Sequence, residues 1–556
     1  MIANAKPTEN NGGIMKVFRK IFLAVTLICL ICTACFGCRI LDGKYPMFTP
    51  SYSERAYIAP DENAIDKLIA ETEKLSGTEG NQRELLKKRE ELLTVFYEVL
   101  TSRTVADIEY YKNTADETLK NRATYIDDYS NVLLNRVLET EKKLFSSAYR
   151  SVLIEATSEE YAASLETSET KSDAVLKLEQ KESELENEYA AAYKTADGAT
   201  IAGIYKELIV TRNKIAAEYA DENGKPYANY HDYAYAKLYA RDYTPEEAKD
   251  FRASVLSEIK PLADEMKTID SSYFTGDRRA GFFSLSEKSL KEISKRVIRE
   301  TAPETLSSWT YMIDRDLYDF SVSDTKMDTS FVTPFAAYGD GFMFVNAAGN
   351  LSDLGTVMHE FGHYNALFAT DADKEGNEAE SIDLAETHSQ AFSLLCLPAV
   401  KKVLASEQLS SYYDYYDYYV IFESLWSLLS NSAFEQFEYE VYRAAPENLT
   451  ESYFNQTFGT AISSYWGATD YSYYEIPHFF QSPAYCVSYS VSLVFASEIW
   501  ALDNAKDKYL ETVSYGAYHK LGDVVSAVGL ESPLEPSVVS KVAEKYRSHI
   551  TDTFAA

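Results

Sequence analysis

The segment LSDLGTVMHEFGHYNALF, residues 351–368, decides the fold and much of the chemistry of this chain. Asn350 or Ser352 can cap a helix that begins here. The apolar residues recur at helical spacing and predict one buried stripe, made of Leu354, Val357, Met358, Phe361 and Phe368. The segment therefore predicts an amphipathic helix with a polar face opposite a buried one.

Two histidines lie on the polar face of this predicted helix. His359 and His363 are four residues apart, so both imidazoles project from one side and can reach one Zn²⁺ ion. Glu360 stands beside the first histidine, where a carboxylate can take a proton from an attacking water. The chain has only 7 histidines, so a chance H-E-x-x-H is rare, on the order of one in a hundred. An ordinary polar helix face would have to bury these groups without a shared partner.

A catalytic zinc site needs a third protein ligand and one open position. The candidate is Glu386, in the segment SIDLAETHSQAFSLL at residues 381–395, which predicts a second helix ended before Pro398. Two histidines and one glutamate form a known catalytic zinc set. His388 is two residues further on and points away from Glu386 on a helix, so we expect it to pack or to support the site rather than to bind metal.

These motifs resemble the oligoendopeptidase F and thimet oligopeptidase (neurolysin-like) family of zinc metallopeptidases. The HEFGH motif, the spacing to Glu386 and the ETHSQAF context carry the resemblance, together with YANYHDYAYAKLYARDYTPEEAKDF at residues 227–251 and IPHFFQSPAYCVSYSVS at residues 476–492. The similarity runs from about residue 209 to the C-terminus. Many family members have a further histidine three residues after the second zinc histidine, where this chain has Ala366.

The resemblance implies a mainly α, two-lobed helical fold with a deep central channel and one small β-sheet next to the zinc helix. It implies one Zn²⁺ per chain, with His359, His363 and Glu386 as ligands and Glu360 as general base. It also suggests three groups that contact the scissile carbonyl, namely His478, Tyr489 and Tyr485. For these three residues, aromatic packing alone is the alternative interpretation.

The rest of the chain agrees with a large helical protein. Of its 556 residues, 46% are hydrophobic, and the formal net charge is -32, which disfavours nucleic-acid binding. The clearest strand signal is GFMFVN, residues 341–346, directly before the motif helix. Thr244, Pro245 and Glu247 predict a helix start with a capping box. The tyrosine-rich segment 411–419 is expected to pack between helices rather than to line a cleft. Cys396 and Cys486 are expected to be buried thiols, with a pairing between them left open.

The N-terminus predicts an export signal. Basic residues precede the apolar run 21–31, and a stretch of small and cysteine residues follows it. The stretch of small and cysteine residues after the apolar run resembles a bacterial lipobox, with Cys35 as the better and Cys38 as the weaker lipidation site. An uncleaved membrane-spanning anchor is the alternative. We expect a signal peptide at 1–34, with Met15 as an alternative start of translation, a tether at 35–60, an N-terminal helical region at 61–208 and a zinc metallopeptidase region at 209–556.

The sequence thus predicts a zinc endopeptidase for short peptides, tethered to a bacterial cell membrane with its catalytic region outside the cytoplasm. One alternative is a zinc carboxypeptidase or dipeptidase on the same scaffold. A second alternative is a peptide-binding lipoprotein that has lost catalysis, although the presence of both histidines and both glutamates argues against it.

The lipid anchor can be tested in a bacterial host. We expect Cys35→Ser to abolish lipid labelling and to release the protein from the membrane fraction, as measured by fatty-acid labelling and fractionation. Loss of labelling in Cys38→Ser alone would move the site to Cys38, and labelling in neither the wild type nor the variants would favour the spanning anchor.

Overall fold

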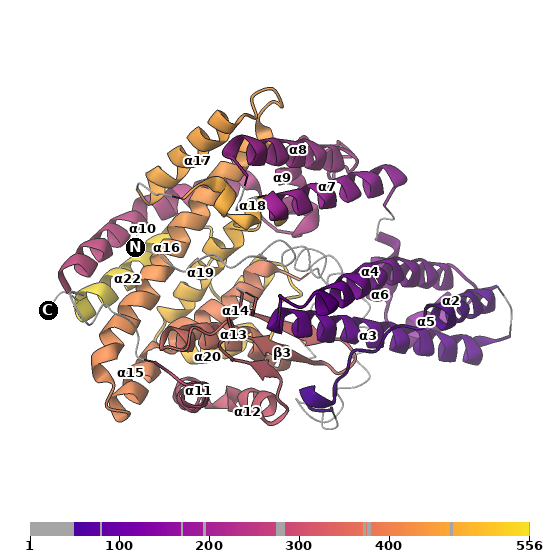
Figure 1. Cartoon of the computed structure of the whole chain (residues 1–556), viewed down its shortest axis with the longest axis horizontal. Helices are drawn as coiled ribbons and strands as arrows, with labels where there is room; N and C mark the ends of the chain where they lie inside the picture. The colour runs from indigo at the N-terminus through magenta and orange to yellow at the C-terminus, as the bar shows by residue number, and fades with distance from the viewer. Residues whose placement is uncertain are drawn as a thin grey trace. The chain divides into compact units, whose positions relative to one another are not determined.

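The computed structural model describes residues 49–77, 80–167, 171–192, 196–273, 284–327, 329–370, 374, 380–467 and 471–554. The predicted signal peptide, Cys35 and Cys38 lie outside this range. Among the helices of the described residues, none is long and apolar enough to cross a membrane. The described chain is mainly α-helical with one small sheet, as expected (Figure 1).

The chain forms two compact units. The first contains the described parts of residues 20–170 and 308–346, and the second those of 171–307 and 347–556. This division follows contacts within the structure. The boundary expected at residues 208 and 209 follows sequence similarity instead and stays a prediction.

The first unit is a set of helices with the sheet. It comprises η1 (Tyr52–Glu54), α2 (Glu62–Ser76), α3 (Gln82–Lys112), α4 (Glu117–Phe145), α5 (Arg150–Ala156), α6 (Glu159–Thr167), most of α12 (Leu306–Asp314), β1 (Tyr318–Asp319), β2 (Phe331–Phe335) and β3 (Asp340–Phe344). The strand order is β1-β3-β2, with β1 parallel and β2 antiparallel to β3. All five residues of β3 are buried. The predicted strand is therefore confirmed, and it precedes the motif helix in the chain.

Charged pairs inside the first unit join segments that are far apart in sequence. Arg55 donates two hydrogen bonds of 2.7 Å to the carboxylate of Asp340, and both side chains are almost fully buried. Arg89 on α3 makes a similar buried pair with Glu141 on α4. Because a buried charge without a partner is costly, each pair fixes the register of the elements that carry it.

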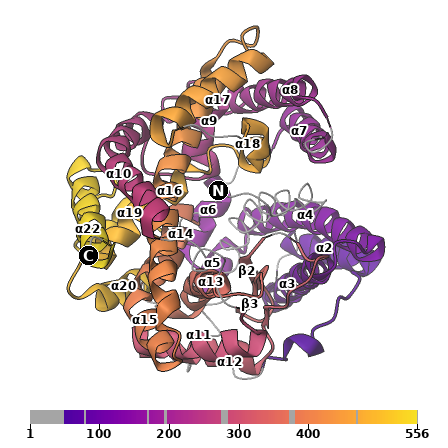
Figure 2. The same cartoon turned by 60° about the vertical axis from the view of Figure 1, so that its left-hand side comes forward.

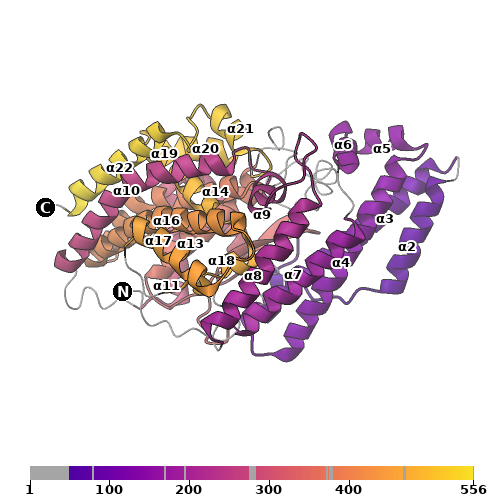
Figure 3. The same ribbon diagram turned by 90° about the horizontal axis from the view of Figure 1, so that it is seen from above.

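The second unit contains the remaining helices. They are α7 (Asp173–Ala192), α8 (Gly198–Ala217), α9 (Tyr230–Tyr233), η2 (Ala234–Leu238), α10 (Pro245–Tyr273), α11 (Glu287–Thr301), η4 (Pro303–Thr305), α13 (Ser352–Ala369), α14 (Ile382–Leu395), α15 (Leu397–Ser406), α16 (Ser410–Arg443), α17 (Glu451–Tyr465), η5 (Tyr473–Glu475), α18 (Pro477–Gln481), α19 (Val487–Trp500), α20 (Ala505–Val513), α21 (Leu521–Ala527) and α22 (Pro536–Phe554). Helix α19 lies at the centre, because every one of its residues except Tyr489 is buried and it packs against α14, α16 and α22 (Figures 1 and 2). Figure 3 shows α10 and α22 side by side along this group.

Two local expectations are confirmed. The N–H of Thr244 donates to the Glu247 carboxylate at 2.7 Å, and the N–H of Glu247 donates to the Thr244 hydroxyl at 3.2 Å, which forms the capping box at the start of α10. The tyrosine-rich segment lies on α16, where Tyr413, Tyr416 and Tyr418 are buried between helices. Both results follow from local sequence and helical periodicity alone.

Candidate active site

Helix α13 carries the HEFGH motif, and its first turn is held by a carboxylate. Asp353 accepts hydrogen bonds from the N–H groups of Ala348, Gly349 and Asn350 at 2.7, 2.8 and 3.1 Å. The expected cap by Asn350 or Ser352 is wrong, because the N-cap residue is Leu351, whose apolar side chain cannot accept a bond; Asn350, one residue earlier, accepts the N–H of Ser352 at 2.8 Å instead. These bonds satisfy backbone donors at the helix start and fix the entry of the chain into α13.

The three predicted ligands meet on α13 and α14. The Nε2 atoms of His359 and His363 each lie 3.5 Å from Oε2 of Glu386. One donor atom from each of the three residues lies within 4.8 Å of the other two. Tetrahedral zinc with bonds of about 2.0–2.2 Å requires donors roughly 3.3–3.5 Å apart. The donor set and its spacing therefore fit a zinc ion.

Gly362 lets the two ligand-bearing helices approach each other closely. A Cβ atom at this position would lie 2.5 Å from Cα of Ser389 and 2.6 Å from the carbonyl oxygen of His388, both on α14. Real Cβ atoms do not come that close to backbone atoms, so only glycine fits here. The contact brings Glu386 on α14 within reach of the two histidines on α13.

Glu360 and Glu386 are both buried, but their environments differ. Glu360 is 5% exposed and its Oε2 has no hydrogen-bond partner among the described residues. Burial raises the pKa of Glu360 to about 7, partly opposed by the charge of His359. Burial alone would also raise the pKa of Glu386, but hydrogen bonds from His359 and His363 outweigh it and hold that pKa well below its usual range. Glu386 is thus suited to bind a cation and Glu360 to exchange a proton.

The three candidate carbonyl-binding residues lie together. The ring centroids of His478, Tyr485 and Tyr489 are 5.1 to 5.9 Å apart. The Tyr485 hydroxyl donates to Oε1 of Glu386 at 3.4 Å, which places this group at the candidate metal site. Burial raises the pKa of both tyrosines well above the usual value. It lowers the pKa of His478 to about 4. All three groups are therefore neutral near pH 7, and the two phenols retain their O–H donors.

Three further residues singled out in the sequence, His388, Cys396 and Cys486, are buried and lie outside the ligand cluster. His388 is 1% exposed and is not part of the ligand cluster, and burial lowers its pKa to about 3. Cys396 and Cys486 are free, buried thiols, so they are not paired with each other. Sequence reasoning did not assign a role to Gly362, although its place inside the metal motif was a signal that two helices could meet there.

The Gly362 contact leads to a test of the metal site. We expect Gly362→Ala to weaken zinc binding on the order of tenfold to a hundredfold, because the added methyl group pushes α14 away from α13. A chelator competition titration measures this affinity. The matched control is Gly459→Ala on α17, an exposed helical glycine with no atom within 4 Å of the added Cβ. It should keep zinc affinity and stabilise the fold by up to about 1 kcal/mol. Equal zinc affinity in the two variants would contradict the proposed role of the contact.

Comparisons with known proteins place the fold. No protein-family model matches the chain, and no curated protein matches it. Among solved structures, the chain is similar to PZ peptidase A with an inhibitor (TM-score 0.72, 20% identity, covering 90% of this chain and 99% of that one). It is also similar to a Bacillus anthracis str. Ames protein assigned to oligoendopeptidase F (TM-score 0.70, 20% identity, covering 91% of this chain and 99% of that one). A third similar structure is the M32 carboxypeptidase of Deinococcus radiodurans R1 (TM-score 0.60, 12% identity, covering 86% of this chain and 100% of that one). The chain therefore has the mainly α fold of oligoendopeptidase structures, which the sequence resemblance implied.

Proposed function

We propose that this chain is a zinc-dependent endopeptidase that hydrolyses short peptides. The observation that supports the proposal most is the meeting of His359, His363 and Glu386 at zinc-compatible spacing, with the buried Glu360 beside them. The similarity to oligoendopeptidase and PZ peptidase structures agrees with it. Short, unfolded peptides are the proposed substrates because the family resemblance implies a recessed site.

The proposed mechanism assigns a role to each group. A zinc ion held by the two histidines and Glu386 would supply a Lewis acid for the scissile carbonyl and would lower the pKa of water. Glu360 takes a proton from the attacking water and passes it to the nitrogen of the leaving amine. Tyr489 or Tyr485 donates a hydrogen bond to the carbonyl oxygen as negative charge develops on it, and His478 supports them.

A carboxypeptidase is the second candidate function, and the observation that favours it is the similarity of the chain to the structure of an M32 carboxypeptidase. A peptide blocked at both ends separates the two activities. Internal cleavage of the blocked peptide, detected by mass spectrometry and abolished by a chelator, supports the endopeptidase. Cleavage only of the unblocked peptide, one residue or one dipeptide at a time from an end, would support an exopeptidase instead.

The location proposed for this activity is the outer side of a bacterial membrane, with a lipid anchor. Its support is the basic, apolar and cysteine-containing N-terminal sequence alone. The proposal for the catalytic groups does not depend on this location.

The role of Glu360 can be tested by an isosteric change. Glu360→Gln should retain zinc but lose turnover of an internally quenched peptide by at least about a hundredfold, because the amide cannot accept the proton. Zinc content and kcat are the two measurements. Glu265→Gln, at an exposed position on α10, is the control and should behave as wild type. Near-normal turnover in the Glu360 variant would refute the assigned base.

Tyr489→Phe separates the catalytic interpretation from aromatic packing. If the phenol stabilises the oxyanion, kcat should fall on the order of a hundredfold while KM and zinc content hardly change, because the bond matters mainly in the transition state. If the ring only packs, activity should stay within a few-fold of wild type, since phenylalanine keeps the ring. That outcome would move the assignment to Tyr485, and Tyr485→Phe would be the next variant to measure.

A further inference from the structure

Residues 482–488, here called the tyrosine loop, comprise the connection after α18 and the first two residues of α19; they include Tyr485 and directly precede Tyr489. The loop contains Ala484 at φ 62°, a left-handed backbone conformation that non-glycine residues rarely adopt. Such a conformation costs of order 1–3 kcal/mol and persists only where neighbouring groups enforce it. Neighbouring side chains therefore have to hold Ala484 in this conformation.

Three side chains hold the backbone of the loop. Arg241 donates from Nη2 to the carbonyl oxygen of Ala484 and to the hydroxyl of Ser488, both at 2.8 Å. The Tyr239 hydroxyl donates to the carbonyl oxygen of Pro483 at 2.9 Å. From α16, Glu438 accepts the N–H of Ala484 at 2.9 Å. Both the N–H and the C=O of the strained residue are thus bound by side chains.

Arg241 comes from a segment that is itself unusual. Residues 234–238 form a single π-helical turn, and Ala240 also has a positive φ, of 46°. The N–H of Arg241 then donates to the carbonyl oxygen of Tyr235 at 2.9 Å. π-Turns and strained residues often occur at functional sites. Ala240 and Ala484, two of the four non-glycine positive-φ residues in the described chain, lie on either side of the Arg241 contact.

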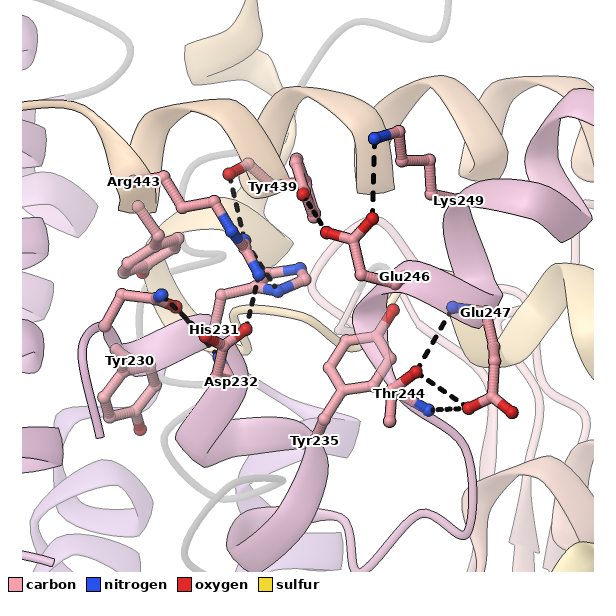
Figure 4. A network of polar contacts seen from close by, with 12 residues as sticks. Tyr230, His231, Asp232, Tyr235, Thr244, Glu246, Glu247, Lys249, Tyr439 and Arg443 are labelled. Carbon is pink, nitrogen blue, oxygen red and sulfur yellow. Dashed lines mark hydrogen bonds and ion pairs between the residues drawn. The ribbon is translucent and has the colours of Figure 1, made fainter. Parts of the chain in front are cut away.

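The segment around Arg241 is held firmly at both ends (Figure 4). Before it, Arg443 on α16 pairs with Asp232 and lies close to His231. After it, Glu246 accepts a hydrogen bond from Tyr439, and the capping box closes the start of α10. A side chain on a segment fixed at both ends can position a loop that packs on it.

Arg241 also interacts electrostatically with α14, the helix that carries Glu386. The rings of Tyr235 and Tyr239 lie 4.4 and 4.6 Å from its guanidinium carbon. Tyr243 donates to Asp383 on α14, one turn before Glu386, at 3.3 Å. The charge of Arg241 stabilises the carboxylate of Asp383 and opposes the effect of burial on its pKa. One cation therefore contacts the tyrosine loop and faces the helix that carries a metal ligand.

We infer that Arg241 is a positioning residue that sets the place of Tyr485 and Tyr489 relative to Glu386 by holding Ala484 in its left-handed conformation. This inference rests on the proposed function, since it concerns donors for the scissile carbonyl. Tyr239 has the same role through Pro483 and through its ring, whose centroid lies 6.1 Å from that of Tyr485.

The main test compares Arg241→Met with Arg89→Met, a control that removes a different buried arginine, one paired with Glu141 in the first unit. Both variants should lower the unfolding temperature. Only Arg241→Met should reduce kcat, by at least about tenfold, with KM within threefold, because a displacement of about 1 Å at a reacting group can cost a hundredfold in rate. An equal loss of kcat in the two variants would overturn the inference.

A second comparison asks whether Arg241 acts through the tyrosines. In a Tyr485→Phe/Tyr489→Phe background, Arg241→Met should lower kcat by less than twofold, since the groups it positions no longer donate. A full tenfold loss in that background would overturn the inference. Where Arg241→Met does not fold, Tyr239→Phe keeps the ring and removes the hydroxyl that donates to Pro483. It should lower kcat about threefold to tenfold, and an unchanged kcat would count against the inference.

A crystal structure of Arg241→Met gives a readout that does not require activity. Departure of Ala484 from positive φ, with displacement of Tyr485 from Glu386, supports the inference, and an unmoved loop overturns it. If the wild-type chain cleaves no peptide, the proposed function fails, and this structural result still decides whether Arg241 positions the loop.

Discussion

The candidate site depends first on one backbone contact, at Gly362. Helix α13 supplies two of the three candidate metal-binding groups and helix α14 the third, so the distance between the two helix axes sets the distance between donor atoms. That distance is short only because the face of α13 at Gly362 has no side chain. Helix α14 in turn packs against α19, which carries Tyr489. The positions of the candidate metal ligands and of the tyrosines are therefore coupled through α14.

The two glutamates of the site show how one residue type can take two roles. Both carboxyl groups are buried, Glu360 on α13 and Glu386 on the adjacent helix α14. Glu386 has imidazole donors beside it, which favour its charged form, whereas burial favours the protonated form of Glu360, whose Oε2 has no hydrogen-bond partner among the described residues. Neighbouring carboxyl groups whose pKa values are pushed apart in this way are typical of acid–base sites.

Sequence patterns predicted the parts of the molecule that depend on local spacing. The helical register of HEFGH, the strand before the motif and the capping box at Thr244 follow from residues within one or two turns of each other, and all three are confirmed in the structure. Glu386 lies on the second helix predicted for it, but its choice as third ligand came from the need for one and from the family spacing rather than from local pattern. The metal-binding and catalytic roles of these residues stay proposals. The contact of Arg241 with Ala484 could not be predicted, because it joins residues 243 positions apart. Nor does an alanine in the sequence indicate a positive φ, since glycine or asparagine is the usual residue there.

The first unit has a feature with a consequence for how the protein is made. Its helices other than α12 come from the chain before residue 171, but its sheet comes from residues 318–344, and the buried pair of Arg55 and Asp340 joins the two parts. During synthesis, α2 to α6 leave the ribosome long before the strands that complete their unit. Until then Arg55 lacks its buried carboxylate, and the surfaces of α3 that meet β2 stay open to other contacts. The nascent chain therefore carries an incomplete helical unit while about 170 further residues, up to Asp340, are translated, and surface exposed during this interval favours aggregation.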